Sequence, residues 1–441
     1  MEILIRILQL FLSLSILVIF HEFGHFAAAK IFKTRVEKFY LFFDPWFSIF
    51  KFKHKETEYG IGWLPLGGYV KISGMIDESM DKDQLAKEPQ PWEFRSKPAW
   101  QRLIIMIGGV TVNVILAMAI YIMMLWTNGQ TYLPTSEVNK NGIYPDSIAQ
   151  VIGFKEGDKI LKVGDKYVKD FQRIPLEIIL NQPKFVEVER DNKIVEVPIT
   201  GEDLALMVNA KSPYLLSPAI PFIVDSIQEN SAAQKAMLKK GDQIIGVNGQ
   251  STPTYYQIRE KILALKGKET KIEVLRNQDT LGINIKIPET GYIGTFVKNE
   301  LAFFKYNTQE FTLLQAIPAG IAKGYTEIGN YLKQIKLIAN PDAKAYEHVG
   351  GFITIGKIFP GTWNWIVFWR ITALLSIMLA VVNILPIPAL DGGHVLFLIY
   401  EVIARRKPSD KFMEVAQVAG MVILFALLIY ANGNDIIKLF K

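Results

Sequence analysis

Four stretches of the chain are long and apolar enough to cross a membrane as helices, which takes about 20 mostly apolar residues. Polar segments that hold most of the charged residues separate them. The pattern predicts a polytopic α-helical membrane protein with about four transmembrane helices. The apolar cores of these helices are Ile7–Phe20, Leu103–Trp126, Trp365–Leu385 and Val415–Tyr430.

The first apolar stretch could instead be a cleaved signal peptide, because small residues at Ala27 and Ala29 follow it. A signal peptide has a basic region ahead of its apolar core. Here Arg6 is the only basic residue in that place, and Glu2 opposes it. We therefore favour a retained membrane helix.

Lysine and arginine residues cluster at the span ends that would lie on one side of the membrane. Cytoplasmic loops are enriched in these two residue types. The loops after the first span, before the second, and between the third and fourth are therefore predicted to be cytoplasmic. Both termini and the long segment between the second and third spans then lie on the outer side. The residues that carry this prediction are Lys30, Lys33, Arg35, Lys38, Lys97, Arg102, Arg405, Arg406 and Lys407.

Between the first two spans, residues 39–72 alternate aromatic and polar side chains and then reach Gly67 and Gly68. Such alternation is typical of β-strands, and paired glycines suit a bend or a close approach of two backbones. The segment is predicted to be a β element, for which an ordinary cytoplasmic hairpin is the simplest form.

An internal repeat occupies the long outer segment. Ser147–Asp158 reads SIAQVIGFKEGD, and Ser231–Asp242, 84 residues later, reads SAAQKAMLKKGD. A Gly-Asp turn, an alternating strand and a second turn follow in both copies. The repeat resembles the PDZ domain, which binds an extended peptide as an added strand. The two copies are predicted to be β-rich PDZ-like domains, serving either as binding modules or as spacers.

Residues 301–351 have a helical, amphipathic and aromatic-rich pattern with breakers at Pro318 and Pro341. Such a segment can lie at the membrane surface. It can equally be an ordinary domain helix.

Composition limits the chemistry. The chain has 441 residues, 50% of them hydrophobic, with a net charge of +6 and no cysteine; its mean hydropathy is +0.20. Without thiolates, a metal ion must be held by His, Asp, Glu or Asn. The charge forms no basic stripe with interleaved aromatics, so the sequence predicts no nucleic-acid partner.

The first span ends in the H-E-x-x-H pattern His21-Glu22-Phe23-Gly24-His25. Residues four apart on a helix share one face, so His21 and His25 can bind one ion. Glu22 lies beside them, placed to hold and deprotonate a metal-bound water. Three polar side chains at membrane depth are functional by default. The alternative is that they cap the end of the span where water begins.

A catalytic zinc site takes three protein ligands, so a third must come from elsewhere. The candidates lie in NILPIPALDGGH, residues 383–394, where Pro386 and Pro388 break the third span. Asp391 occupies a glycine-flanked turn that can aim its carboxylate inward, whereas His394 begins the next helical run. Asp391 is therefore the preferred ligand and His394 its rival.

Two amides, Asn113 and Asn383, lie in apolar spans and need partners there. Either they hydrogen-bond one helix to another, or they face the site. In the second case Asn383 would bind the substrate backbone and Asn113 would orient the tetrahedral intermediate.

These motifs resemble those of the site-2 protease family of intramembrane zinc metalloproteases, and most closely its bacterial members with tandem PDZ domains. The likeness rests on H-E-F-G-H, on N-x-x-P-x-P-x-L-D-G and on LPLGGYVK (Leu64–Lys71). It implies zinc on His21, His25 and Asp391, with Glu22 as the general base. It also favours substrate binding for Asn383, whereas the family's G-P-x-x-N lacks its proline here, which leaves Asn113 less certain.

The resemblance further implies what the protein acts on. Substrates would be single-pass membrane proteins such as anti-sigma factors, or signal-peptide remnants, cut within the lipid bilayer after another protease has trimmed them. The β element with Gly67 and Gly68 would dip into the membrane and pair with unwound substrate. The setting would be a stress response at the bacterial inner membrane, with the PDZ-like domains in the periplasm.

Two rival functions follow from the same features. One is a membrane-anchored PDZ scaffold with an inactive metal site, against which Glu22 argues. The other is a metal transporter, which would need polar residues through several spans. The predicted regions are 1–30 (first span), 31–102 (β region), 103–127 (second span), 128–213 and 214–298 (PDZ-like domains), 299–363 (amphipathic segment), 364–404 (third span and L-D-G) and 405–441 (loop and fourth span).

Overall fold

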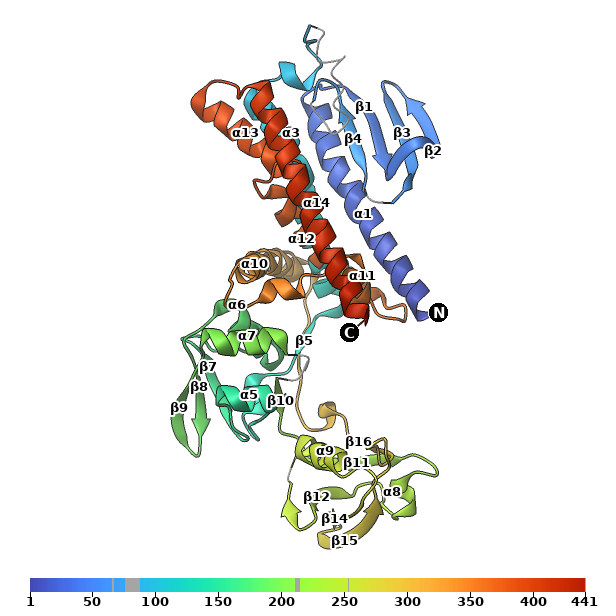
Figure 1. The fold of residues 1–441 in the computed structure, drawn as a ribbon, viewed down its shortest axis with the longest axis vertical. Helices are drawn as coiled ribbons and strands as arrows, with labels where there is room; N and C mark the ends of the chain where they lie inside the picture. Colours follow the sequence, from blue (N-terminus) through green and yellow to red (C-terminus); the bar gives the residue numbers. More distant parts are fainter. Residues whose placement is uncertain (66, 76–87, 211–214, 253, 441) are drawn as a thin grey trace. The chain divides into compact units, whose positions relative to one another are not determined.

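The computed structural model describes residues 1–65, 67–75, 88–210, 215–252 and 254–440 (Figure 1). These residues form two compact units. The first unit consists of residues 1–129, 310–339 and 346–441, and the second of residues 130–309 and 340–345.

The described part of the chain contains four helices long and apolar enough to cross a membrane, which confirms the predicted fold class. The first is longer than its apolar core, so the H-E-x-x-H residues are helical as well. The four are α1 (Glu2–Ile31), α3 (Ala99–Asn128), α12 (Trp365–Ile384) and α14 (Asp410–Phe440).

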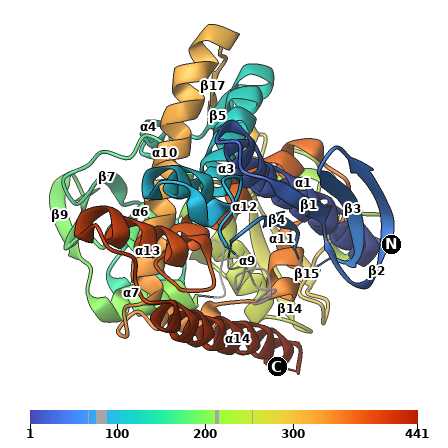
Figure 2. The ribbon, with the colours of Figure 1, turned by 90° about the horizontal axis from the view of Figure 1, so that it is seen from above.

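Helix α3 is the centre of the first unit. It packs against α1, α12, α10 (Leu313–Ile338) and α13 (Asp391–Ala404), while α14 lies along the edge (Figure 2). Glycines let α1 and α3 approach closely, because a Cβ on Gly24 would clash with the carbonyl of Gly108. The face of α1 that carries the histidines is thereby held against α3.

A four-stranded sheet follows α1, as the alternating pattern predicts. Its order is β2-β3-β1-β4, with β1 and β3 parallel and the other pairs antiparallel. β4 is therefore an edge strand. Leu66, just before it, lies outside the described residues. The strands are β1 (Val36–Leu41), β2 (Phe43–His54), β3 (Thr57–Leu64) and β4 (Tyr69–Ile72).

The amphipathic segment contains α10, which packs on α3. A Cβ on Gly320 or Gly324 would clash with Ile122 or Met118 of α3, so these glycines form the contact face. Pro318 lies inside α10 and does not end it, contrary to its expected role as a breaker. The short helix α11 (Phe352–Ile358) precedes α12.

The second unit contains two β-rich domains. The first has the sheet β7-β8-β9 and the second the sheet β15-β14-β12-β11-β16. The core of the first also takes Leu216, Ile220 and Phe304, beyond residue 213 where its end was predicted. The strands are β7 (Lys159–Val163), β8 (Phe185–Arg190), β9 (Lys193–Pro198), β11 (Phe222–Ile227), β12 (Gln243–Val247), β14 (Glu269–Arg276), β15 (Asp279–Lys286) and β16 (Thr295–Val297).

The repeat reappears in this unit as the same ion pair in both domains. Arg190 donates hydrogen bonds to both carboxylate oxygens of the buried Asp158, and Arg276 does so to the buried Asp242. Both aspartates belong to the repeated Gly-Asp turns. The other elements are β5 (Gln130–Tyr132), α4 (Thr135–Val138), β6 (Ile143–Pro145), α5 (Ser147–Ile152), α6 (Ile174–Asn181), α7 (Gly201–Asn209), β10 (Leu216–Pro218), α8 (Ala232–Lys235), β13 (Gln250–Ser251), α9 (Tyr255–Ala264) and β17 (Asn307–Gln309).

Candidate metal centre

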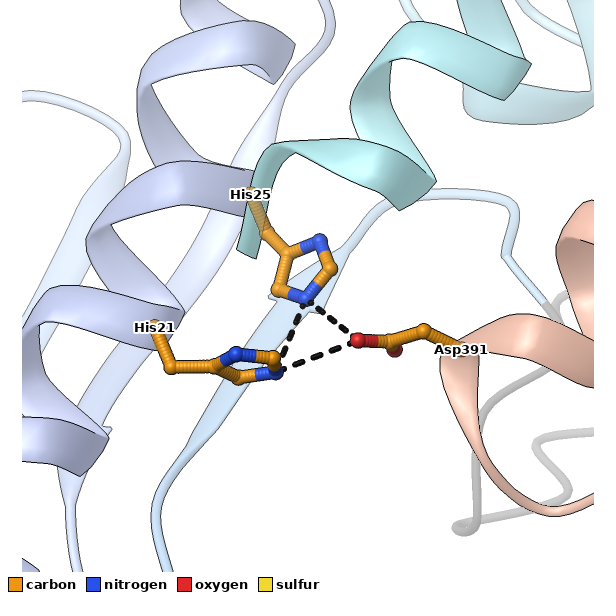
Figure 3. Close-up of side chains that lie close together, drawn as sticks. All are labelled: His21, His25 and Asp391. Atoms are coloured by element: carbon orange, nitrogen blue, oxygen red, sulfur yellow. Dashed lines mark hydrogen bonds and ion pairs between the residues drawn. The ribbon is translucent and has the colours of Figure 1, made fainter. Parts of the chain in front are cut away.

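Three side chains from two distant parts of the chain converge in the first unit: His21 and His25 of α1, and Asp391 at the start of α13 (Figure 3). His21 Nε2 lies 3.1 Å and His25 Nε2 3.3 Å from Asp391 Oδ2. The two Nε2 atoms are 3.3 Å apart. Both histidines are buried.

This triangle fits a zinc ion. With metal–ligand distances near 2.0–2.1 Å, the edge of a coordination tetrahedron measures about 3.3 Å. Asp391 Oδ2 is buried and accepts no hydrogen bond from the described residues. Two imidazole nitrogens and one carboxylate oxygen, all groups that can bind a metal ion, therefore face one another and leave a fourth position open.

The Nδ1 atom of each imidazole has a hydrogen-bond partner, and that partner determines which ring nitrogen carries the proton. His25 Nδ1 lies 2.9 Å from the carbonyl oxygen of Ile105, which can only accept, so Nδ1 carries the proton. His21 Nδ1 lies 3.1 Å from the Asn113 carboxamide nitrogen, and Asn113 Oδ1 has no partner among the described residues. Exchanging the amide N and O lets Oδ1 accept from Nδ1–H. Both Nε2 lone pairs then face the metal position.

Asp391 reaches the histidines through a tight turn. Pro386 and Pro388 end α12, and Ala389 has a φ of +82°, which is rare for a residue with a Cβ. A Cβ on Gly392 would clash with the carbonyl oxygen of Leu385, and one on Gly393 with Pro388. The two glycines after Asp391 therefore allow α13 to begin directly against the broken end of α12.

The cluster borders a cavity of about 760 Å³. His394 lines it too, but the candidate metal site among the described residues contains Asp391 and not His394. Asn383 lies there with its amide nitrogen 3.2 Å from His21 Nε2, whereas Asn113 is fully buried behind His21. The lining also includes Glu22, Gly67, Gly68, Tyr69, Val70 and Gln417.

Gly68 brings the loop before β4 close to α1. A Cβ there would lie 2.6 Å from Val18 and 3.4 Å from the Glu22 side chain. Gly67 has a φ of +149°, which favours glycine. Nearby, burial and the hydrogen bond that Tyr69 donates to Asp44 raise the pKa of Tyr69, so its hydroxyl stays a neutral donor. The glycine pair thus places the edge strand β4 along the cavity.

Gly109, the glycine of the G-x-x-x-N motif that ends at Asn113, has a contact that the sequence did not predict. Gly109 of α3 lies against both imidazoles: a Cβ there would clash with His25 Nε2 and would lie 2.7 Å from His21 Cε1. The pair Gly108-Gly109 inside an apolar span also indicates a close helix contact, because small residues mark such contacts in membranes. Only the folded structure shows that the contact is with the two histidines.

Replacing Gly109 by alanine should therefore displace the imidazoles and weaken zinc binding by at least about tenfold, the scale seen when the shell around a metal site is disturbed. Gly433→Ala in α14 is the matched control, because a Cβ there meets nothing within 4 Å. Zinc affinity is measured on both variants by competition with a chelating dye. Wild-type affinity in Gly109→Ala would contradict the contact.

Comparison with known proteins agrees with this geometry. The family model for peptidase family M50 matches residues 9–427. A Campylobacter jejuni protein named as a candidate zinc metalloprotease, Cj1068, is 29% identical over 99% of this chain and 94% of its own. The regulator of sigma E protease of Haemophilus influenzae is 26% identical over 97% of this chain and 98% of its own. Protease RseP of Yersinia pestis is 26% identical over 100% of both chains. The chain therefore belongs to peptidase family M50, the site-2 family of zinc metalloproteases.

Proposed function

We propose that this protein is an intramembrane endopeptidase that cuts the transmembrane segment of single-pass membrane proteins. One observation carries the proposal: the His21, His25 and Asp391 cluster lies on a membrane-spanning helix and the start of α13, beside a cavity that Glu22 also lines. A hydrolytic site built into a membrane helix is suited to a peptide bond that also lies in the membrane.

Each site residue has a role in this proposal. His21, His25 and Asp391 hold zinc, which supplies Lewis acidity when bound. Glu22 takes a proton from the attacking water and passes it to the leaving amine nitrogen. Asn113, buried against His21 Nδ1, orients the imidazole and does not line the cavity.

The substrate must unwind, because a helix hides the carbonyl of its scissile bond in its own hydrogen bonds. An extended segment can then pair with the free edge of β4, which lines the cavity. Gly67 and Gly68 let this strand lie close to Glu22. Asn383, at the end of α12, binds the substrate backbone beside the metal position.

The relatives suggest a biological setting. Two of them are named as a regulator of sigma E protease and protease RseP. We propose that this chain acts in the same kind of pathway, on anti-sigma factors already trimmed by another protease, or on signal-peptide remnants. It would reside in the bacterial inner membrane with the PDZ-like domains in the periplasm.

Metal analysis followed by a cleavage assay tests the activity. Purified protein should hold about one zinc ion per chain and cut a single-pass substrate within its apolar segment, and chelation should stop the cut. A membrane-anchored PDZ scaffold would show no cleavage. A metal transporter would instead move zinc across vesicle membranes without cleaving any substrate.

The second unit gives a further prediction about substrate choice. We expect the tandem PDZ-like domains to act as a size filter, so their removal should permit cleavage of untrimmed substrates. β5 and β17 are antiparallel, with Tyr132 paired to Asn307. Replacing residues 133–306 with a short Gly-Ser turn therefore preserves that pair and closes the gap as a hairpin.

Long and short versions of one substrate are compared with the full chain and with this deletion, in detergent and in bilayers. The filter predicts cleavage of the long form by the deletion alone and equal cleavage of the short form by both. Unchanged selectivity would reduce the domains to spacers. Poorer cleavage of the short form would make them recruiting modules.

A further inference from the structure

Gln417 is a buried polar residue in a helix that is otherwise mostly exposed. It belongs to α14, where apolar side chains such as Val415, Val418 and Val422 are exposed, as expected for a helix that faces lipid. Gln417 is only 7% exposed. It lines the same cavity as Glu22 and Asp391, and both of those residues lie far from it in the sequence.

The carboxamide of Gln417 makes no hydrogen bond to any residue that the structure describes. An amide in a membrane helix is costly unless its donors and acceptor find partners. Neither lipid chains nor the described protein supplies one. The amide is therefore available to a polar group that enters the cavity.

The position of Gln417 is set by a close helix contact one turn further along α14. A Cβ on Gly420 would clash with the carbonyl oxygen of Pro388, in the turn that leads to Asp391. Gln417 and Gly420 are three residues apart and so share one face of α14. The contact at Gly420 holds that face against the metal-binding turn, with Gln417 directed into the cavity.

We propose that Gln417 binds the main chain of the unwound substrate segment. This rests on the proposed intramembrane cleavage. An extended strand has two edges of N–H and C=O groups, and pairing with β4 can satisfy only one of them. A carboxamide offers both a donor and an acceptor, which matches one residue of the other edge. That contact would favour the extended, cleavable form of the substrate.

The test separates binding from chemistry. Substrate affinity is measured in a Glu22→Gln background, which keeps the metal ligands, with a fluorescent transmembrane peptide in micelles. Adding Gln417→Met, which keeps the side-chain length and removes the amide, should weaken binding by about five- to tenfold, the scale expected for the loss of one net hydrogen bond. Val418→Leu, on the exposed side of α14, is the control and should bind normally.

Kinetics on the active chain give a second measure. Gln417→Met should raise KM by the same factor and leave kcat within about twofold, since a contact made equally in ground and transition states changes KM alone. Zinc content should stay at the wild-type level. Unchanged peptide affinity and KM in Gln417→Met would overturn the proposal.

Peptides with a single backbone ester distinguish main-chain from side-chain contact. Each ester removes one N–H donor near the cut site. At one position the ester and Gln417→Met should not be additive, because both remove the same hydrogen bond. If the effects of Gln417→Met and of the ester are additive at every position, the main-chain contact is refuted. If Gln417→Met is instead non-additive with a change of a substrate side chain, Gln417 is a specificity residue.

The experiment also distinguishes failure of this inference from failure of the proposed function. If the wild-type protein binds zinc but cuts no transmembrane substrate, the proposed function fails. If the wild type cuts and Gln417→Met behaves like Val418→Leu, only the role of Gln417 fails.

Discussion

Replacing Glu22 by glutamine should abolish cleavage while the protein keeps close to one zinc ion per chain. The ligand atoms of His21, His25 and Asp391 are untouched by this change. Glutamine cannot accept the proton of the attacking water, and loss of a general base lowers rates by about 10²–10⁴-fold. The measurement pairs initial cleavage rates with elemental analysis of the same sample.

Glu2→Gln provides the matched control for this variant. Glu2 lies in the same helix and is exposed, so the same chemical change should leave both rate and zinc content as in the wild type. Glu22→Gln that retains a third or more of the wild-type rate would remove Glu22 from the role of base. Loss of zinc in that variant would make Glu22 a ligand.

The second large effect concerns the third ligand. Asp391→Ala should release zinc, because two imidazoles alone leave a site without its only anionic ligand; affinity should fall by at least about 100-fold. His394→Ala should keep zinc, since His394 lies in the cavity wall outside the cluster. Competition with a chelator of known affinity measures both.

Asp391→Asn refines the result, because it keeps the shape of the side chain and removes its charge. Intermediate zinc affinity between Asp391→Ala and the wild type is expected if Asp391 Oδ2 binds the ion. Retention of zinc by Asp391→Ala together with its loss from His394→Ala would transfer the ligand role to His394.

The features that depend only on residues close together in the sequence could be predicted from the sequence. Membrane spans follow from the apolar content of about 20 successive residues. The shared face of His21 and His25 follows from the helical period, because four residues make about one turn. The repeated Gly-Asp turns follow from local turn chemistry, and both recur in the structure as Asp158 and Asp242. Each of these is a short-range property, so no tertiary information is needed.

The tertiary structure decided what lies next to the histidines. Asp391 and His394 are three residues apart, and only the turn at Pro386–Ala389 determines which of them meets His21. The sequence left Asn113 with two possible roles, and the packing of α3 against α1 places its side chain beside His21 Nδ1. The contacts at Gly109 and Gly420 bring α3 and α14 to the same site. Helix packing joins residues that are far apart in the chain, and hydropathy and local propensity carry no information on which faces meet.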